Sequence, residues 1–176
     1  MNWSKTLRTA CVAAVVVVSA ADAHAQTQIT QITVRVKTRL DTHNSCSTFT
    51  CGGPTFGTNS DVYLGIAGRE FRLDRPSGDF DNGSDVTFVL GESTNVVNAD
   101  RNDPRRDMPV FLTAPFAFPV YLRMSERIDD DWNMEFVEVR IFSGTGAAMS
   151  LRGFWTATGR VFGREFGYQV PLTRAM

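Results

Sequence analysis

Residues 57–64 read GTNSDVYL, a polar turn that runs directly into a strand pattern. Two later stretches repeat this arrangement: residues 77–84 read SGDFDNGS, and residues 129–139 read DDDWNMEFVEV. Each places oxygen-bearing side chains just before a period-two pattern, which is typical of a turn that leads into a half-buried strand. If the strand ends lie side by side, the three turns gather at one end of a β-sandwich.

Alternation of apolar and polar side chains continues along most of the chain and favours an all-β fold. The segments that show it are residues 32–37, 62–67, 70–73, 86–90, 120–124 and 136–142. Residues 154–170 are expected to form a hairpin that turns at Thr158-Gly159. No window combines helical periodicity with caps. Short strands broken by Gly, Pro, Asn and Asp predict an antiparallel sandwich rather than a parallel α/β fold.

The order of these motifs resembles the PLAT domain, also called the LH2 domain, of lipoxygenases and lipases. Four elements carry the resemblance: a first strand ITVRVKT at residues 32–38, the turn and strand GTNSDVY at 57–63, an Asp-Phe-x-x-Gly turn at 79–83, and Asp-Trp before Val-Glu-Val at 131–139. They occur in order between about residues 31 and 142, and nothing of the family is carried beyond Phe142. The resemblance implies an antiparallel β-sandwich of two four-stranded sheets.

The same resemblance implies a candidate calcium site, because some PLAT domains bind calcium through these turns. Carried over position by position, the candidate ligands are Gly57, Thr58, Asn59, Asp79, Asp130 and Asp131. Calcium takes about six to eight oxygen ligands in flexible geometry, which such turns can supply. Asn59 stands where calcium-binding members often have Asp, so the missing charge should weaken affinity. The alternative is that Asp and Asn only stabilise the turns, which they do without any metal.

The first 25 residues have the pattern of a secretory signal peptide. Lys5 and Arg8 precede a short apolar run at residues 10–21, and Ala23-His24-Ala25 forms a small-x-small cleavage site. The run is shorter than the roughly 20 residues that span a bilayer, which argues against a retained anchor. We therefore expect a signal peptide at residues 1–25, one PLAT-like domain at 26–176, and a secreted or periplasmic protein.

Cys46 and Cys51 are the two cysteines of the expected mature chain, and they lie in a long loop at residues 40–56. In an oxidising compartment such an isolated pair predicts a disulfide. A redox site would more often read Cys-x-x-Cys, and a zinc site would need more ligands than the nearby His43.

Aromatic side chains near the turns divide into two predicted groups. Phe80 and Trp132 lie next to strands in the family pattern and are expected to pack in the core. Phe49 and Phe56 lie in the long loop outside that pattern, so they are the candidates for contact with a membrane or a partner.

Charge and motif content exclude several functions. The formal net charge is −1 and no basic block occurs, so nucleic-acid binding has no electrostatic footprint. The chain has no Gly-x-Ser-x-Gly, His-Glu-x-x-His or phosphate-loop motif. Glu135 and Glu138 are three apart on a strand, so they face opposite sides and cannot act as an acid/base pair.

We expect a non-catalytic protein that binds a membrane surface or a membrane-associated protein, with calcium as the candidate cofactor. The alternative is a protein–protein interaction module for an envelope or secreted partner, without lipid contact. A small enzyme with an unrecognised site is the weaker third interpretation.

Overall fold

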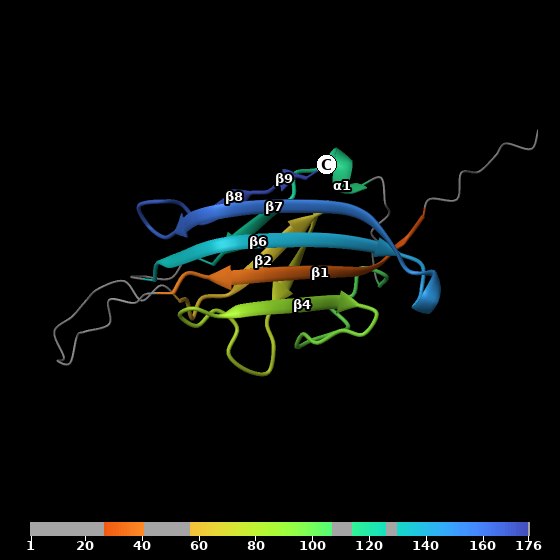
Figure 1. The fold of residues 1–176 in the computed structure, drawn as a ribbon, viewed down its shortest axis with the longest axis horizontal. Helices are drawn as coiled ribbons and strands as arrows, with labels where there is room; N and C mark the ends of the chain where they lie inside the picture. The colour runs from red at the N-terminus through yellow and green to blue at the C-terminus, as the bar shows by residue number, and fades with distance from the viewer. Residues whose placement is uncertain (1–26, 41–56, 107–113, 126–129, 176) are drawn as a thin grey trace, which may run out of the picture.

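The computed structural model describes residues 27–40, 57–106, 114–125 and 130–175. Their strands form two antiparallel sheets that pack face to face (Figure 1). The five-stranded sheet has the order β4-β1-β6-β7-β9, and the four-stranded sheet has the order β3-β2-β5-β8. The strands are β1 (Ile29–Thr38), β2 (Val62–Ile66), β3 (Arg69–Leu73), β4 (Asp85–Gly91), β5 (Tyr121–Met124), β6 (Trp132–Ser143), β7 (Ser150–Phe162), β8 (Gln169–Pro171) and β9 (Thr173–Arg174). The helices are the short α1 (Ala114–Ala117) and the 3₁₀ turn η1 (Gly146–Ala148).

The predicted all-β sandwich is confirmed, and each of the six alternating segments lies in or beside a strand. The prediction of four strands in each sheet is wrong for one sheet, which has β9 as a fifth strand. β9 pairs with β7 only at Trp155 and Thr156, and two residues are too few to show an alternating pattern.

The predicted turn at Thr158-Gly159 is also wrong. β7 continues through these residues in constant register with β6, with Thr158 opposite Phe136 and Arg160 opposite Met134. Thr-Gly has the local chemistry of a turn, but pairing with a long neighbouring strand overrides it. The chain instead turns at residues 163–168, where Gly163 and Gly167 form an isolated bridge.

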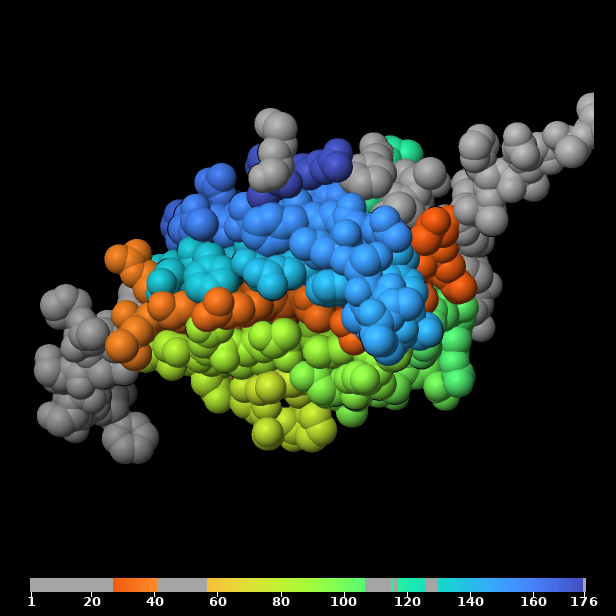
Figure 2. Space-filling view, turned by 45° about the vertical axis from the view of Figure 1, so that its right-hand side comes forward, coloured from red at the N-terminus to blue at the C-terminus, as the bar shows by residue number. Residues whose placement is uncertain are grey.

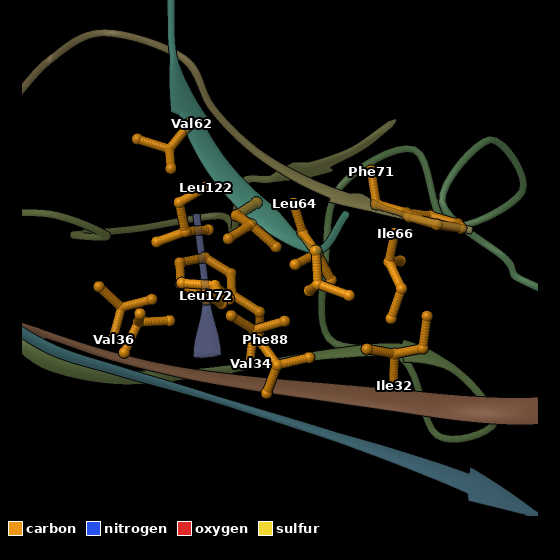
Figure 3. Close-up of a cluster of buried hydrophobic side chains, with 14 of the residues drawn as sticks. Ile32, Val34, Val36, Val62, Leu64, Ile66, Phe71, Phe88, Leu122 and Leu172 are labelled. Atoms are coloured by element: carbon orange, nitrogen blue, oxygen red, sulfur yellow. The ribbon is translucent and has the colours of Figure 1, made fainter. Parts of the chain in front are cut away.

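The core lies between the sheets and is built by the inward-facing side chains of alternating strands. Ile32, Val34 and Val36 of β1 are at most 1% exposed, while the residues between them face outward. Figure 3 shows these side chains below Val62 and Leu64 of β2, with the two rows pointing toward one another. Because side chains alternate across a strand, one sheet face of β1 is apolar and the other is charged.

The segment at residues 92–106 covers one edge of each sheet. Asn95 Oδ1 accepts from the N–H of Val89 on β4 at 2.7 Å, and Asn102 Oδ1 accepts from the N–H of Arg72 on β3 at 2.9 Å. Asn102 is 5% exposed, so this loop is partly buried. Covering an edge strand in this way protects its backbone from pairing with another chain.

Four connections between the sheets meet at one end of the sandwich, on the left in Figure 1. The end of β1 leads toward β2, β3 leads into β4, β5 leads toward β6, and β7 leads into β8. We call their described residues the loop end: 39–40, 57–61, 74–84, 125, 130–131 and 163–168. The expectation that the three polar turns gather at one end is therefore confirmed.

Candidate functional site

The turn at residues 57–60 is fastened to the turn before β6. Asp130 Oδ2 accepts a hydrogen bond from Thr58 Oγ1 at 2.6 Å and a second, shorter one from the Ser60 hydroxyl. Thr58 Oγ1 also accepts from the Ser60 N–H at 2.9 Å, which closes the turn on itself. Asp130 thus has a structural role, because one carboxylate oxygen orders two hydroxyl groups of another connection.

Gly57 lets the acidic turn at residues 79–83 lie directly against this first turn. A Cβ on Gly57 would stand 2.6 Å from the Phe80 carbonyl oxygen and 3.0 Å from the Asn82 nitrogen. The same approach allows the Thr58 N–H to donate to the Phe80 carbonyl at 3.0 Å. The glycine of the motif is therefore required by backbone packing, whatever the turn binds.

Asp61 stabilises the beginning of β2 through ion pairs and backbone bonds. Its carboxylate lies 2.7 Å from Arg72 Nη2, and Arg72 also pairs with Asp74 at 3.0 Å. The Asp61 N–H donates to Ser125 Oγ at 3.0 Å, and the Ser125 N–H donates to the Asp61 carbonyl at 2.7 Å. Asp61, whose charge is balanced by Arg72, thus connects β2 with β3 and with the segment after β5.

Asp79 stabilises the turn in which it lies. Its carboxylate accepts from the Arg75 N–H at 2.7 Å and from Arg75 Nε at 3.2 Å, and its side chain is 14% exposed. Burial raises the pKa of Asp79 above its ordinary value and outweighs the opposing hydrogen bonds from Arg75. A largely buried carboxylate that already holds Arg75 is a weaker cation ligand than the sequence suggests.

Two adjoining hollows occupy the loop end. The smaller, of about 250 Å³, is lined by Gly57, Thr58, Asn59, Phe80, Asp81, Asn82 and Asp130. The larger, of about 320 Å³, shares Thr58, Asn59, Phe80 and Asp81 and continues along residues 72–79. Four of the six predicted calcium ligands therefore line the smaller hollow, and Asp79 lines only the larger one.

Asp131 faces a different part of the loop end. A Cβ on Gly163 would collide with the Asp131 carboxylate, so Asp131 lies over the β7–β8 connection. The structure thus separates Asp131 from Asp130 although the two are neighbours in sequence. Asp81 and Asn82, which the sequence prediction left out, join the smaller hollow instead.

The smaller hollow is lined by oxygen atoms of the kinds that bind calcium, but few of these oxygens carry charge. In the described part of the chain, no group of three or more His, Cys, Asp or Glu residues is arranged to hold a metal ion. A calcium ion at the hollow would have two carboxylates to use, Asp81 and Asp130, with the remaining ligands from amide, hydroxyl or backbone oxygens. Such a low charge count favours weak binding.

The aromatic side chains of the acidic turns are in the core, as expected. The Phe80 ring lies 5.1 Å from Trp132, which lies 4.8 Å from Phe162. The indole N–H of Trp132 donates to Thr38 Oγ1 at 3.0 Å, with both residues fully buried. These rings support the turns from below and cannot insert into a membrane.

Two other apolar side chains are exposed at the loop end. Phe166, at the tip of the β7–β8 connection, is 62% exposed, and Leu40, after β1, is 59% exposed. Phe166 was missed because the sequence prediction placed this hairpin's turn at Thr158-Gly159. The pair Gly163 and Gly167 around a polar tip was the available signal. The predicted contact residues Phe49 and Phe56, and the cysteines Cys46 and Cys51, lie outside the described residues.

Comparisons with known proteins give distant structural similarities. No family model matches the chain, and no curated protein matches it. Among solved structures, it is similar to alpha toxin from Clostridium absonum, with 17% identity, a TM-score of 0.39, and coverage of 75% of this chain and 33% of that chain. It is also similar to a lipoxygenase variant, Delta413-417:GS I805A LOX, with 17% identity, a TM-score of 0.43, and coverage of 82% and 16%.

The chain thus spans a third or less of these neighbours. Because the TM-scores mark only distant similarity, no activity is transferred from them, and the PLAT resemblance stays a prediction from the four motifs. Within the described residues, no helix has the length and apolar character needed to cross a membrane.

Proposed function

We propose that this protein is a non-catalytic module that binds a membrane surface through its loop end, with assistance from calcium. The observation that carries the proposal is the placement of two exposed apolar side chains, Phe166 and Leu40, at the same end as the oxygen-lined hollow. An apolar tip beside a cation site is an arrangement that suits the boundary between headgroups and acyl chains.

The expected affinity follows from the size of the apolar tips. Full burial of one Phe or Leu side chain contributes at most about 3 kcal/mol. Two such residues alone give weak and reversible membrane association, comparable to a single lipid anchor. Further contacts are therefore needed, from headgroups or from the loop at residues 41–56.

A bound calcium ion would provide some of those further contacts. Asp131 lies against the β7–β8 connection, and Phe166 follows Arg164 and Glu165, so two carboxylates and one guanidinium group flank the apolar tip. Anionic headgroups would be repelled by these carboxylates at short range. A calcium ion at the hollow lined by Asp81 and Asp130 would reduce that repulsion and add oxygen contacts to phosphate.

A non-catalytic role is supported by the use of the acidic side chains. Asp61 pairs with Arg72, Asp79 holds Arg75, and Asp130 accepts from Thr58 and Ser60. These carboxylates are engaged in holding the turns together, which supports a structural use for them. The signal-like N-terminus adds the proposal that the protein works outside the cytoplasm.

The proposal is tested by vesicle co-sedimentation of a double variant, Leu40→Ser with Phe166→Ser. The vesicles contain phosphatidylcholine and phosphatidylserine, and calcium is present. The matched control is Leu151→Ser, which removes an equally exposed leucine from β7 away from the loop end. We expect the double variant to lose most of its binding and the control to retain it. Equal binding by all three proteins would reject the loop end as the contact surface.

A further inference from the structure

A third hollow lies on the side of the sandwich, away from the two at the loop end, and is lined by positive charge. Its volume is about 610 Å³. Three arginines line it, Arg140, Arg152 and Arg174, together with the apolar side chains Leu151 and Phe154. No acidic residue is among its described lining residues, in a chain whose formal net charge is −1.

Arg140 and Arg152 are oriented by contacts with neighbouring side chains. Arg140 lies over the Phe154 ring, with 5.7 Å from its guanidinium carbon to the ring centroid, and it pairs with Glu138 at 2.7 Å. Arg152 Nε donates to Ser143 Oγ at 2.6 Å, and Ser143 is itself buried. A guanidinium group has five N–H donors, so one such bond orients it and leaves donors for an incoming anion.

A β-bulge brings Arg152 to this position. Ile141 of β6 stands opposite Gly153, but the next residue, Phe142, stands opposite Leu151. Arg152 therefore has no opposing residue on β6. Bulges of this kind redirect a side chain, and they occur often beside functional sites.

The hollow is open to solvent and far from the loop end. Figure 2 shows β1, β6 and β7 forming bands across the molecular surface on the outer side of the five-stranded sheet. Phe154 lies eight residues before Phe162, whose end of β7 adjoins the loop end, which is about 26 Å along a strand. A membrane that contacts Phe166 would leave this hollow accessible to a protein.

We infer that this hollow binds an acidic segment of a partner protein in which an apolar residue lies next to Asp or Glu. The apolar residue would rest on Leu151 and Phe154, and the carboxylates would pair with the surrounding arginines. Arg and aromatic side chains around a desolvated centre are the composition of energetically important protein contacts. Bidentate pairing of guanidinium with carboxylate supplies both affinity and orientation. The inference stands apart from the proposed membrane contact and concerns a different surface.

The test uses a fluorescein-labelled synthetic peptide, Asp-Glu-Leu-Asp-Glu-Phe, and anisotropy titration of the full mature protein. A second peptide with Lys at every acidic position is the probe control. The protein variant is Arg152→Glu with Arg174→Glu. Its matched control is Arg101→Glu with Arg160→Glu, which makes the same change in net charge at two exposed positions outside the hollow.

We expect the acidic peptide to bind and the Lys peptide not to bind. The Arg152/Arg174 variant should bind at least about tenfold more weakly, and the Arg101/Arg160 variant within about threefold of wild type. Equal weakening in both variants, or no selective binding with Kd below about 1 mM, would overturn the inference. Displacement of the peptide by anionic vesicles without calcium would also overturn it, since the hollow would then be a lipid site.

Two measurements keep this result separate from the loop-end proposal. The Arg152/Arg174 variant should still sediment with vesicles, and the Leu40/Phe166 variant should still bind the peptide. If charge reversal prevents folding, as judged by the thermal transition, Arg152→Gln with Arg174→Gln replaces it and should weaken peptide binding in the same direction.

Discussion

The Phe80 carbonyl oxygen lies directly above Gly57, only 2.6 Å from where a side-chain Cβ would begin. This contact joins two of the three polar turns by backbone packing alone. The Gly57→Ala variant should therefore lower the free energy of unfolding by about 1–3 kcal/mol, because either the turn or residue 57 must shift. Urea denaturation followed by circular dichroism measures the change. Ser77→Ala, an exposed change in the neighbouring turn, should stay within about 0.5 kcal/mol of wild type, and an equal effect of both variants would contradict the packing argument.

Trp132 and Thr38 form a buried hydrogen bond that supports the loop end from the core. Thr38→Val keeps the side-chain volume but leaves the indole N–H without its acceptor, at a cost of about 1–3 kcal/mol. The same change in a Trp132→Phe background removes no hydrogen bond and should cost less. A double-mutant cycle measures this difference, and strict additivity would show that the bond contributes nothing.

Asp79 and Glu70 should respond to acid in opposite directions. Burial raises the pKa of Asp79, so the folded state takes up its proton first, and Asp79 makes stability increase as the pH falls toward its ordinary value of about 3.8. The hydrogen bond from Arg123 lowers the pKa of Glu70, whose contribution is intact above about 4.5 and is lost as the pH falls through its lowered value.

Thermal unfolding between about pH 3 and pH 7 separates the two residues. Relative to wild type, Asp79→Asn should lose melting temperature as the pH is lowered, and Glu70→Gln should gain it. Parallel pH profiles for the two variants would contradict the assigned environments.

The disulfide predicted between Cys46 and Cys51 can be tested without structural data on that loop. Intact-mass analysis after alkylation, without reduction, should show neither thiol modified in exported material. Reduction before alkylation should then allow both to react. Two alkylated cysteines in unreduced exported protein would show that the pair is not a disulfide.

Much of the fold could be predicted because β-strands alternate with a period of two. The segment ITVRVKT of β1 shows its buried and exposed faces in the sequence itself, and six alternating segments were located in this way. The length of β7 could not be predicted, since Thr158-Gly159 has local turn chemistry and only the partner strand β6 decides otherwise. Because the turn was predicted at the wrong place, Phe166 was not predicted as an exposed residue.

The position of the candidate site could be predicted from the sequence, but the roles of its individual side chains could not. The three turns were expected at one end. Thr58 and Asp130, which are 72 positions apart in the sequence, form a hydrogen bond there. The use of Asp79 to hold Arg75, and of Asp61 to hold Arg72, depends on side-chain directions that the sequence pattern does not carry. The edge-covering role of Asn102 depends in the same way on a backbone N–H from another segment.

Calcium-dependent association with membranes is the central claim, and co-sedimentation of the wild-type protein tests it most directly. Vesicles of phosphatidylcholine with phosphatidylserine are mixed with the mature protein, once with millimolar calcium and once with a chelator. We predict that the protein sediments with the vesicles in calcium and returns largely to the supernatant in chelator. A protein that stays in the supernatant under both conditions, while remaining folded, would contradict the claim.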